Sequence, residues 1–126
     1  MEHSAGFLKL AEAARSRVRE ISPAEAHARR AADRGVRLFD VREDHEWIDG
    51  HAKDAEHLSR GIIERDIERL VPDKDTELIL YCGGGYRSAL ACDNLQQMGY
   101  RNVRSMAGGW KAWKEAELPT EGQPEV

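Results

Sequence analysis

An apolar run that ends in a cysteine, followed by three glycines and an arginine, constrains this chain more than any other feature. Residues 78–88 read Leu-Ile-Leu-Tyr-Cys-Gly-Gly-Gly-Tyr-Arg-Ser. The apolar residues do not alternate with polar ones, which is typical of a strand covered by helices on both faces. A helical pattern occupies residues 88–98. We therefore predict a strand, a tight loop and a helix, with Cys82 at the carboxyl end of the strand.

The loop after Cys82 is suited to hold negative charge. Gly83, Gly84 and Gly85 permit backbone conformations that turn successive N–H groups inward. The helix that follows presents further unpaired N–H groups at its N-terminus, and Arg87 adds a cation. Because a cysteine attacks as the thiolate, these surroundings favour a nucleophilic Cys82 over an inert, packed one.

The spacing between Cys82 and Arg87 narrows the chemistry of the loop. Four residues separate the two, so the ring of N–H groups is tight and suits one additional sulfur atom on the cysteine. Phosphatases that use cysteine generally place the arginine one residue further on, since a tetrahedral oxyanion needs a wider ring. The loop thus favours a persulfide over a phosphocysteine. A phosphatase or an arsenate reductase is the alternative.

Helical and strand patterns alternate along the rest of the chain. Helices are expected at residues 7–19, 23–33, 43–48, 88–98 and 110–115, and one more follows Ser59. Strands are expected at residues 18–21, 36–41, 55–58, 77–81 and 102–105. The alternation predicts an α/β domain with a parallel sheet and helices on both faces. We assign a helical extension to residues 1–19, the domain to 20–119 and a tail to 120–126, and we expect residues 117–126 to fray.

Composition and charge argue against several classes of function. The chain has 126 residues and a formal net charge of −4, which disfavours nucleic acid as a partner although arginines gather in the first third. Its two cysteines do not make a disulfide framework, and Cys92 is expected to pack in the core. With no signal peptide and no apolar run of membrane-spanning length, we expect a cytoplasmic protein without membrane contact.

Three histidines recur at intervals of six residues, namely His45, His51 and His57. This interval is not that of a helical ligand pair, so no metal and no other cofactor is expected. His51 is expected instead to make a buried hydrogen bond near the end of a strand.

Taken together, the motifs resemble the rhodanese homology family. The resemblance rests on residues 38–43, Glu46 and Gly50-His51, on the Cys-x4-Arg loop, on Gly99-Tyr100 and Asn102-Val103, and on Gly-Gly-Trp-Lys-Ala-Trp at 108–113. It covers residues 21–119. It implies a single rhodanese-like domain with a five-stranded parallel sheet, and it implies sulfurtransferase activity.

The resemblance also implies a mechanism and its residues. Cys82 takes a sulfane sulfur from a donor such as thiosulfate, and cyanide or a thiol then removes it in a ping-pong scheme. Arg87 is expected to attract the anionic donor, and Asp40 and Arg42 to form an ion pair that braces the strand end. The persulfide would be held by the loop residues Gly83, Gly84, Gly85, Tyr86 and Ser88.

One connection departs from the family pattern. The segment after His51 is usually Ile-Pro-Gly-Ala, whereas residues 52–55 here are Ala-Lys-Asp-Ala, and Ser59 replaces a common proline. The change affects the rim of the pocket, where Arg60 is expected either to help bind the donor or to lie on the surface as an ordinary exposed arginine.

A second functional hypothesis comes from the binding class. The domain would receive a persulfide from one protein and pass it to another, with little turnover of small molecules. An exposed Tyr86, the basic first third and the N-terminal helix would then form the docking face. The expected partners are thus a small sulfur donor and acceptor, or a protein that carries a persulfide.

Overall fold

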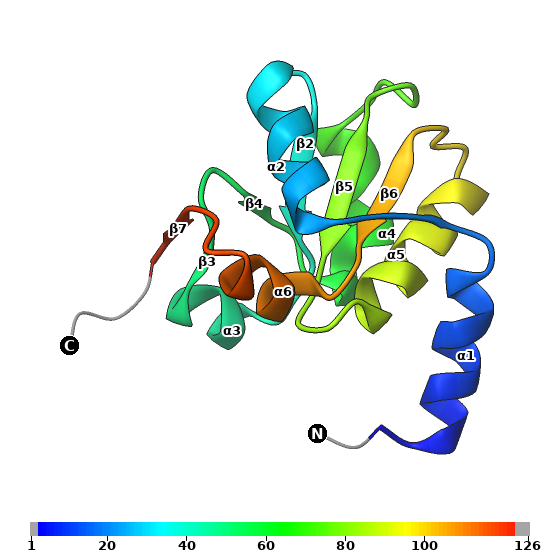
Figure 1. Ribbon diagram of the computed structural model, residues 1–126. Coiled ribbons are helices and arrows are strands. Elements are labelled where there is room, and N and C mark those ends of the chain that lie inside the picture. The colour runs from blue at the N-terminus through cyan, green and yellow to red at the C-terminus, as the bar shows by residue number, and fades with distance from the viewer. Residues whose placement is uncertain (1–2, 123–126) are drawn as a thin grey trace.

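The computed structural model describes residues 3–122, which form a parallel five-stranded sheet between two layers of helices (Figure 1). The sheet has the order β1-β6-β5-β2-β4, and every neighbouring pair is parallel. Its strands are β1 (Arg19–Ile21), β2 (Arg37–Asp40), β4 (Glu56–His57), β5 (Leu78–Tyr81) and β6 (Val103–Met106). The predicted α/β fold is confirmed.

Within residues 3–122, six helices surround the sheet: α1 (Ala5–Arg15), α2 (Pro23–Ala32), α3 (Asp44–Asp49), α4 (Arg60–Leu70), α5 (Tyr86–Gln97) and α6 (Gly109–Glu115). Side chains of α4 and α5 pack with Phe39, Leu78 and Leu80 on one face. Side chains of α2 and α6 pack with Leu38 and Ile79 on the other. The alternating strand residues therefore enter two separate cores.

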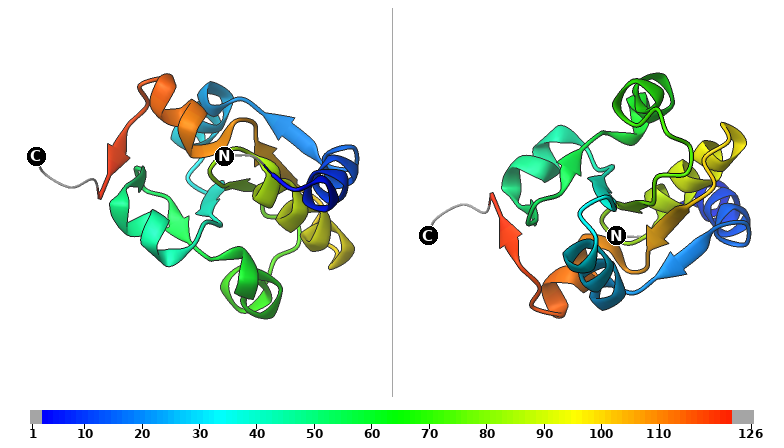
Figure 2. Two further views of the ribbon diagram at one scale, coloured as in Figure 1. Left: turned by 90° about the horizontal axis from the view of Figure 1, so that it is seen from below. Right: turned by 90° about the horizontal axis from the view of Figure 1, so that it is seen from above.

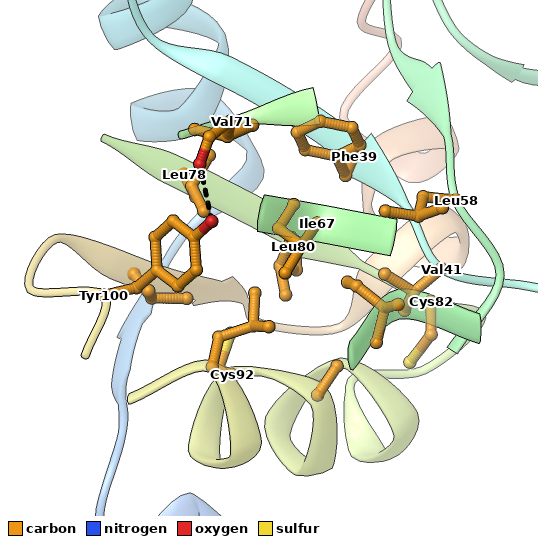
Figure 3. Close-up of a cluster of buried hydrophobic side chains, with 14 residues drawn as sticks. Phe39, Val41, Leu58, Ile67, Val71, Leu78, Leu80, Cys82, Cys92 and Tyr100 are labelled. Carbon is orange, nitrogen blue, oxygen red and sulfur yellow. Dashed lines mark hydrogen bonds between the residues drawn. The ribbon is translucent and has the colours of Figure 1, made fainter. Parts of the chain in front are cut away.

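Strand β5 lies at the centre of the sheet, and all four of its side chains are buried. This explains the uninterrupted apolar run, because both faces are covered. Figure 3 shows the core beneath α4 and α5, with Cys82 at one end of the cluster beside Val41. The nucleophile loop therefore begins where the most enclosed strand ends.

Helix α1 is shorter than the pattern at residues 7–19 predicts. It ends at Arg15, and Arg19 already pairs with Arg104 in the sheet. Strand pairing overrides the helical spacing there, so the prediction was wrong for residues 16–19. Helix α1 lies beside α5 (Figure 2), where Arg17 forms a two-pronged ion pair with Asp93 at 3.0 and 2.7 Å.

A second, two-stranded sheet was not predicted. Strand β3 (His51–Ala52) pairs antiparallel with β7 (Thr120–Glu121), so this part of the expected tail does not fray. The backbone N–H of Lys53 also donates to the carbonyl of Pro119 at 3.0 Å. Residues 123–126, which belong to the same predicted tail, lie outside the described residues. Within residues 3–122, no helix has both the length and the apolar character to cross a membrane.

Candidate active site

Cys82 lies at the carboxyl end of β5 and is 1% exposed. Its Sγ accepts a hydrogen bond of 3.0 Å from the backbone N–H of Gly85. Ser88 lies on the other side, with Oγ 3.6 Å from Sγ, and its hydroxyl also contacts Ser105 Oγ at 2.8 Å and the Gly85 carbonyl at 3.2 Å. The sulfur is thus held among hydrogen-bonding groups at the N-terminus of α5.

The glycine loop is fixed from behind by the first turn of α6. The N–H groups of Trp110 and Lys111 donate to the carbonyl oxygens of Cys82 and Gly83 at 2.7 and 3.2 Å. In a trans peptide the N–H points opposite to the C=O, so the N–H groups of Gly83 and Gly84 face away from α6. The first N–H groups of α5 have no intrahelical acceptor. Together these donors can stabilise an anion bound at the loop.

Arg87 is paired with a carboxylate of α3. Its Nη1 and Nη2 donate to Glu46 Oε1 and Oε2 at 2.7 and 3.0 Å, and Glu46 Oε1 also accepts from the backbone N–H of Glu43. The hydrogen bonds from Arg87 hold the pKa of Glu46 at about 2. The sequence placed Glu46 in a motif shared with the rhodanese homology family, but it did not predict that Glu46 pairs with Arg87.

A cavity of about 700 Å³ opens above Cys82. Arg60, at the first position of α4, lies in its wall together with Tyr86 and Arg87. The Arg60 Nε is buried without a hydrogen-bond partner, and no carboxylate within residues 3–122 pairs with the guanidinium. Arg60 therefore faces the cavity and is not an ordinary surface arginine.

The first residues of the described chain complete this cavity. The ring centres of His3 and Phe7 lie 5.0 and 6.1 Å from the ring centre of Tyr86, and Arg15 lies over the Tyr86 ring. The half-buried Tyr86 is thus not the exposed docking residue that the second hypothesis expected. Sequence reasoning missed His3 and Phe7 as site residues, because spacing places Phe7 on an apolar stripe without saying where the helix docks.

Asp40 and Arg42 form a buried ion pair at the end of β2. Arg42 Nε and Nη2 donate to the Asp40 carboxylate at 3.0 and 2.7 Å, and Nη2 also donates to the Gly50 carbonyl at 2.6 Å. The guanidinium lies 5.1 Å from the centre of the Trp110 ring. Since the Trp110 N–H binds the Cys82 carbonyl, the pair is positioned to support the loop from below.

The altered connection at residues 52–55 is anchored at its first residue. The backbone N–H of Ala52 donates to Tyr81 Oη at 3.0 Å, and burial raises the pKa of Tyr81 above its ordinary value. His51 Nδ1 lies 3.0 Å from the carbonyl oxygen of Trp47, and the two rings stack. His51 thus makes a hydrogen bond beside the strand end.

Cys92 lies inside the core and takes no part in the cavity. It is fully buried in the cluster between the sheet and α4 and α5 (Figure 3), and burial raises the pKa of its thiol well above the ordinary value. A thiol with a raised pKa is a poor nucleophile near neutral pH.

Comparisons with known proteins bear on this site. The family model described as the Rhodanese-like domain matches residues 22–116. Putative sulfurtransferase YtwF of Bacillus subtilis is 36% identical over 102 residues, covering 81% of this chain and 96% of that protein. Thiosulfate sulfurtransferase GlpE of Haemophilus influenzae is 34% identical over 101 residues, covering 80% of this chain and 92% of that protein.

A solved structure is similar over nearly the whole chain. It is that of RPA3614 from Rhodopseudomonas palustris, a protein of unknown function described as a possible tyrosine phosphatase. The TM-score is 0.83 at 27% identity, and the match covers 96% of this chain and 98% of that chain. The similarity therefore extends beyond the residues that the family model matches.

Proposed function

Because this chain belongs to the rhodanese-like domain family, whose relatives include sulfurtransferases, we propose that it transfers sulfane sulfur through a persulfide on Cys82. The observation that carries the proposal is the hydrogen bond from the Gly85 N–H to Cys82 Sγ, within a loop only four residues long. This donor and the N–H groups at the start of α5 favour negative charge on the cysteine sulfur and on a sulfur bound to it.

In the first half-reaction, the Cys82 thiolate attacks the outer sulfur of a donor such as thiosulfate. A bond forms between Sγ and that sulfur, the S–S bond of thiosulfate breaks, and its electron pair leaves with sulfite. The negative charge that remains on the transferred sulfur faces the loop N–H groups. In the second half-reaction, cyanide or a thiolate takes this sulfur, and the electron pair returns to Sγ.

Arg60 and Arg87 have different parts in binding the donor. Arg87 is already neutralised by Glu46, whereas Arg60 has no carboxylate partner among the described residues. Arg60 therefore supplies the stronger attraction for an anionic donor that enters the cavity. Arg87 holds Glu46 beside the loop and adds a weaker attraction of its own. The ion pair of Asp40 and Arg42 supports the loop and does not touch the donor.

The decisive experiment is intact-mass measurement after incubation with thiosulfate and removal of the excess donor. We expect the native chain and the Cys92→Ala variant to gain the mass of one sulfur atom, because Cys92 lies outside the cavity. Cys82→Ala should gain none. If the native chain gains no sulfur from thiosulfate or from an organic persulfide, the proposal is wrong.

A phosphatase is the alternative that the description of RPA3614 raises. The short loop disfavours it, since a tetrahedral phosphate needs a wider ring of donors. Turnover of an aryl phosphate that is lost in Cys82→Ala would identify a phosphatase. We expect no such turnover.

A further inference from the structure

One wall of this cavity is formed by α1 and the residues just before it, which precede the part of the chain that the family model matches. The match begins at residue 22, whereas His3 and Phe7 come from the segment before it. Helix α1 packs on α5 through Ala14, Ala89 and Leu90, and the segment after α1 is fixed by the Arg17–Asp93 ion pair. The wall is thus packed against the rest of the domain.

The chemistry of this wall is aromatic. The rings of His3, Phe7 and Tyr86 lie in mutual contact, with ring centres 5.0 to 6.1 Å apart, and all three line the cavity. Aromatic faces and edges contribute binding free energy mainly by burying apolar or aromatic surface of a ligand. Neither thiosulfate nor cyanide has such a surface.

The size of the cavity also favours a ligand larger than thiosulfate or cyanide. Its volume of about 700 Å³ lies within the range of roughly 300–1,000 Å³ that is typical of sites for drug-sized organic ligands. An inorganic anion bound between Cys82 and Arg60 leaves most of this volume empty. The cavity therefore has room for a ligand with an organic body that extends from Cys82 toward α1.

We propose that the sulfur acceptor is an organic thiol whose apolar or aromatic body packs against Phe7 and Tyr86 while its sulfur reaches Cys82. The inference rests on the proposed sulfurtransferase function and names the acceptor class for it. Helix α1 then determines acceptor specificity, and the loop determines the chemistry.

The transfer balances without any further reactant. The acceptor thiolate attacks the outer sulfur of the Cys82 persulfide, and a new S–S bond forms between them. The bond between Sγ and the outer sulfur breaks, and its electron pair returns to Sγ as the Cys82 thiolate. The outer sulfur keeps its negative charge throughout, so the products are the Cys82 thiolate and an organic persulfide anion.

Two thiols with the same reacting end test the proposal, 2-phenylethanethiol and 2-mercaptoethanol. The full chain is first loaded with sulfur from thiosulfate, and its discharge is followed by intact mass at subsaturating thiol. The ratio of the two second-order rate constants is the readout. We expect the ratio to fall about tenfold in Phe7→Ala, because part of a buried aromatic contact is lost. Phe7→Leu should give an intermediate ratio.

Leu10→Ala is the matched control, since Leu10 lies on the same helix but is 56% exposed and does not line the cavity. It should leave the ratio unchanged. Circular dichroism shows whether α1 stays folded in Phe7→Ala. If α1 unfolds in that variant, the ratio measured for Phe7→Leu tests the inference instead. A native ratio near one, or equal ratios in the native, Phe7→Leu and Leu10→Ala chains, overturns the inference while loading and discharge to cyanide still support the proposed function. A failure to load Cys82 overturns both.

Discussion

The backbone N–H of Trp110 donates a hydrogen bond of 2.7 Å to the carbonyl oxygen of Cys82. The nucleophile loop is therefore held by a segment that follows it by nearly thirty residues. This contact requires the two segments of the chain to approach closely at Gly109, which has a positive φ of 54°. A Cβ built on Gly109 would lie only 2.9 Å from the Cys82 carbonyl carbon and would overlap its oxygen.

Gly109→Ala should therefore displace the loop. We expect sulfur loading from thiosulfate to slow at least about tenfold, since a small misplacement of catalytic groups has effects of this order or larger. The midpoint of thermal unfolding should also fall. Gly61→Ala is the control, because a Cβ at Gly61 meets no atom within 4 Å and alanine is preferred inside a helix. Equal loading rates in the two variants would contradict the role of the α6 contact.

Replacement of Arg60 should weaken the binding of anionic donors. We expect Arg60→Gln to raise KM for thiosulfate about tenfold, because a hydrogen bond to a charged group contributes about 1.5–3 kcal/mol. Arg65→Gln is the matched control, since Arg65 lies on the same helix, is exposed and pairs with Asp66. Steady-state kinetics of both variants, with cyanide as acceptor, checks the expectation. It fails if the two KM values agree.

Arg87→Ala should raise KM for thiosulfate in part by leaving Glu46 unpaired beside the loop. Addition of Glu46→Gln to this variant removes the repulsive carboxylate, so we expect the double variant to recover some of the loss. The four KM values of this double-mutant cycle provide the measurement. Strictly additive effects would show that Arg87 and Glu46 do not act as a pair.

The ion pair of Glu46 and Arg87 should stabilise the fold in a pH-dependent way. The pKa of Glu46 is about 2 in the folded chain, against an ordinary value of 4.5. The unfolded chain therefore binds more protons between these values, and the contribution is complete above about pH 4.5 and is lost toward pH 2. Because 27% of the Glu46 side chain remains exposed, solvent screens part of the interaction with Arg87, and we expect only about 1–2 kcal/mol.

Urea unfolding at pH 7, 5 and 3 provides this measurement for the native chain and for Glu46→Gln. The difference between the two free energies of unfolding should be constant from pH 7 to 5 and smaller at pH 3. The subtraction cancels the other carboxylates, whose titration is common to both chains. A difference that does not change across this range would argue against the depressed pKa of Glu46.

Asp40→Asn should be strongly destabilising. It leaves the buried guanidinium of Arg42 without its counter-charge, and breaking one partner of a buried ion pair costs about 3–5 kcal/mol. Glu68→Gln removes one partner of the solvent-exposed pair with Lys74 and should cost less than about 1 kcal/mol. Equilibrium unfolding in urea compares the two. Similar costs would mean that Asp40 does not brace the strand end.

The part of the site that could be predicted from the sequence is the part encoded in one short stretch. The buried β5, the turn after Cys82 and the helix that begins the anion site all follow from the pattern at residues 78–98. The ion pair of Asp40 and Arg42 was also expected, because the resemblance to the rhodanese homology family implied it.

The rest depends on contacts between distant segments that leave no periodic signal. Strands β3 and β7 have two residues each, too few to show alternation, and their pairing is decided by the fold around Tyr81 and Ala52. The docking of α1 depends on the packing of Ala14 against Ala89 and on the Arg17–Asp93 ion pair, and these residue types are common in helices. Glu46, the partner of Arg87, had a local signal in the sequence. Glu43 and Glu46 form a capping box at the start of α3, which fixes where the Glu46 side chain begins.

The central position of β5 also governs how Cys82 meets reagents. Both neighbours of β5 pair with it in parallel, so its amide hydrogens should exchange with solvent only through global unfolding. Local opening of the sheet therefore does not expose the thiol. The rate at which an alkylating agent labels Cys82 should depend on the size of the reagent and the width of the cavity mouth, and mild destabilisation by urea should scarcely change it.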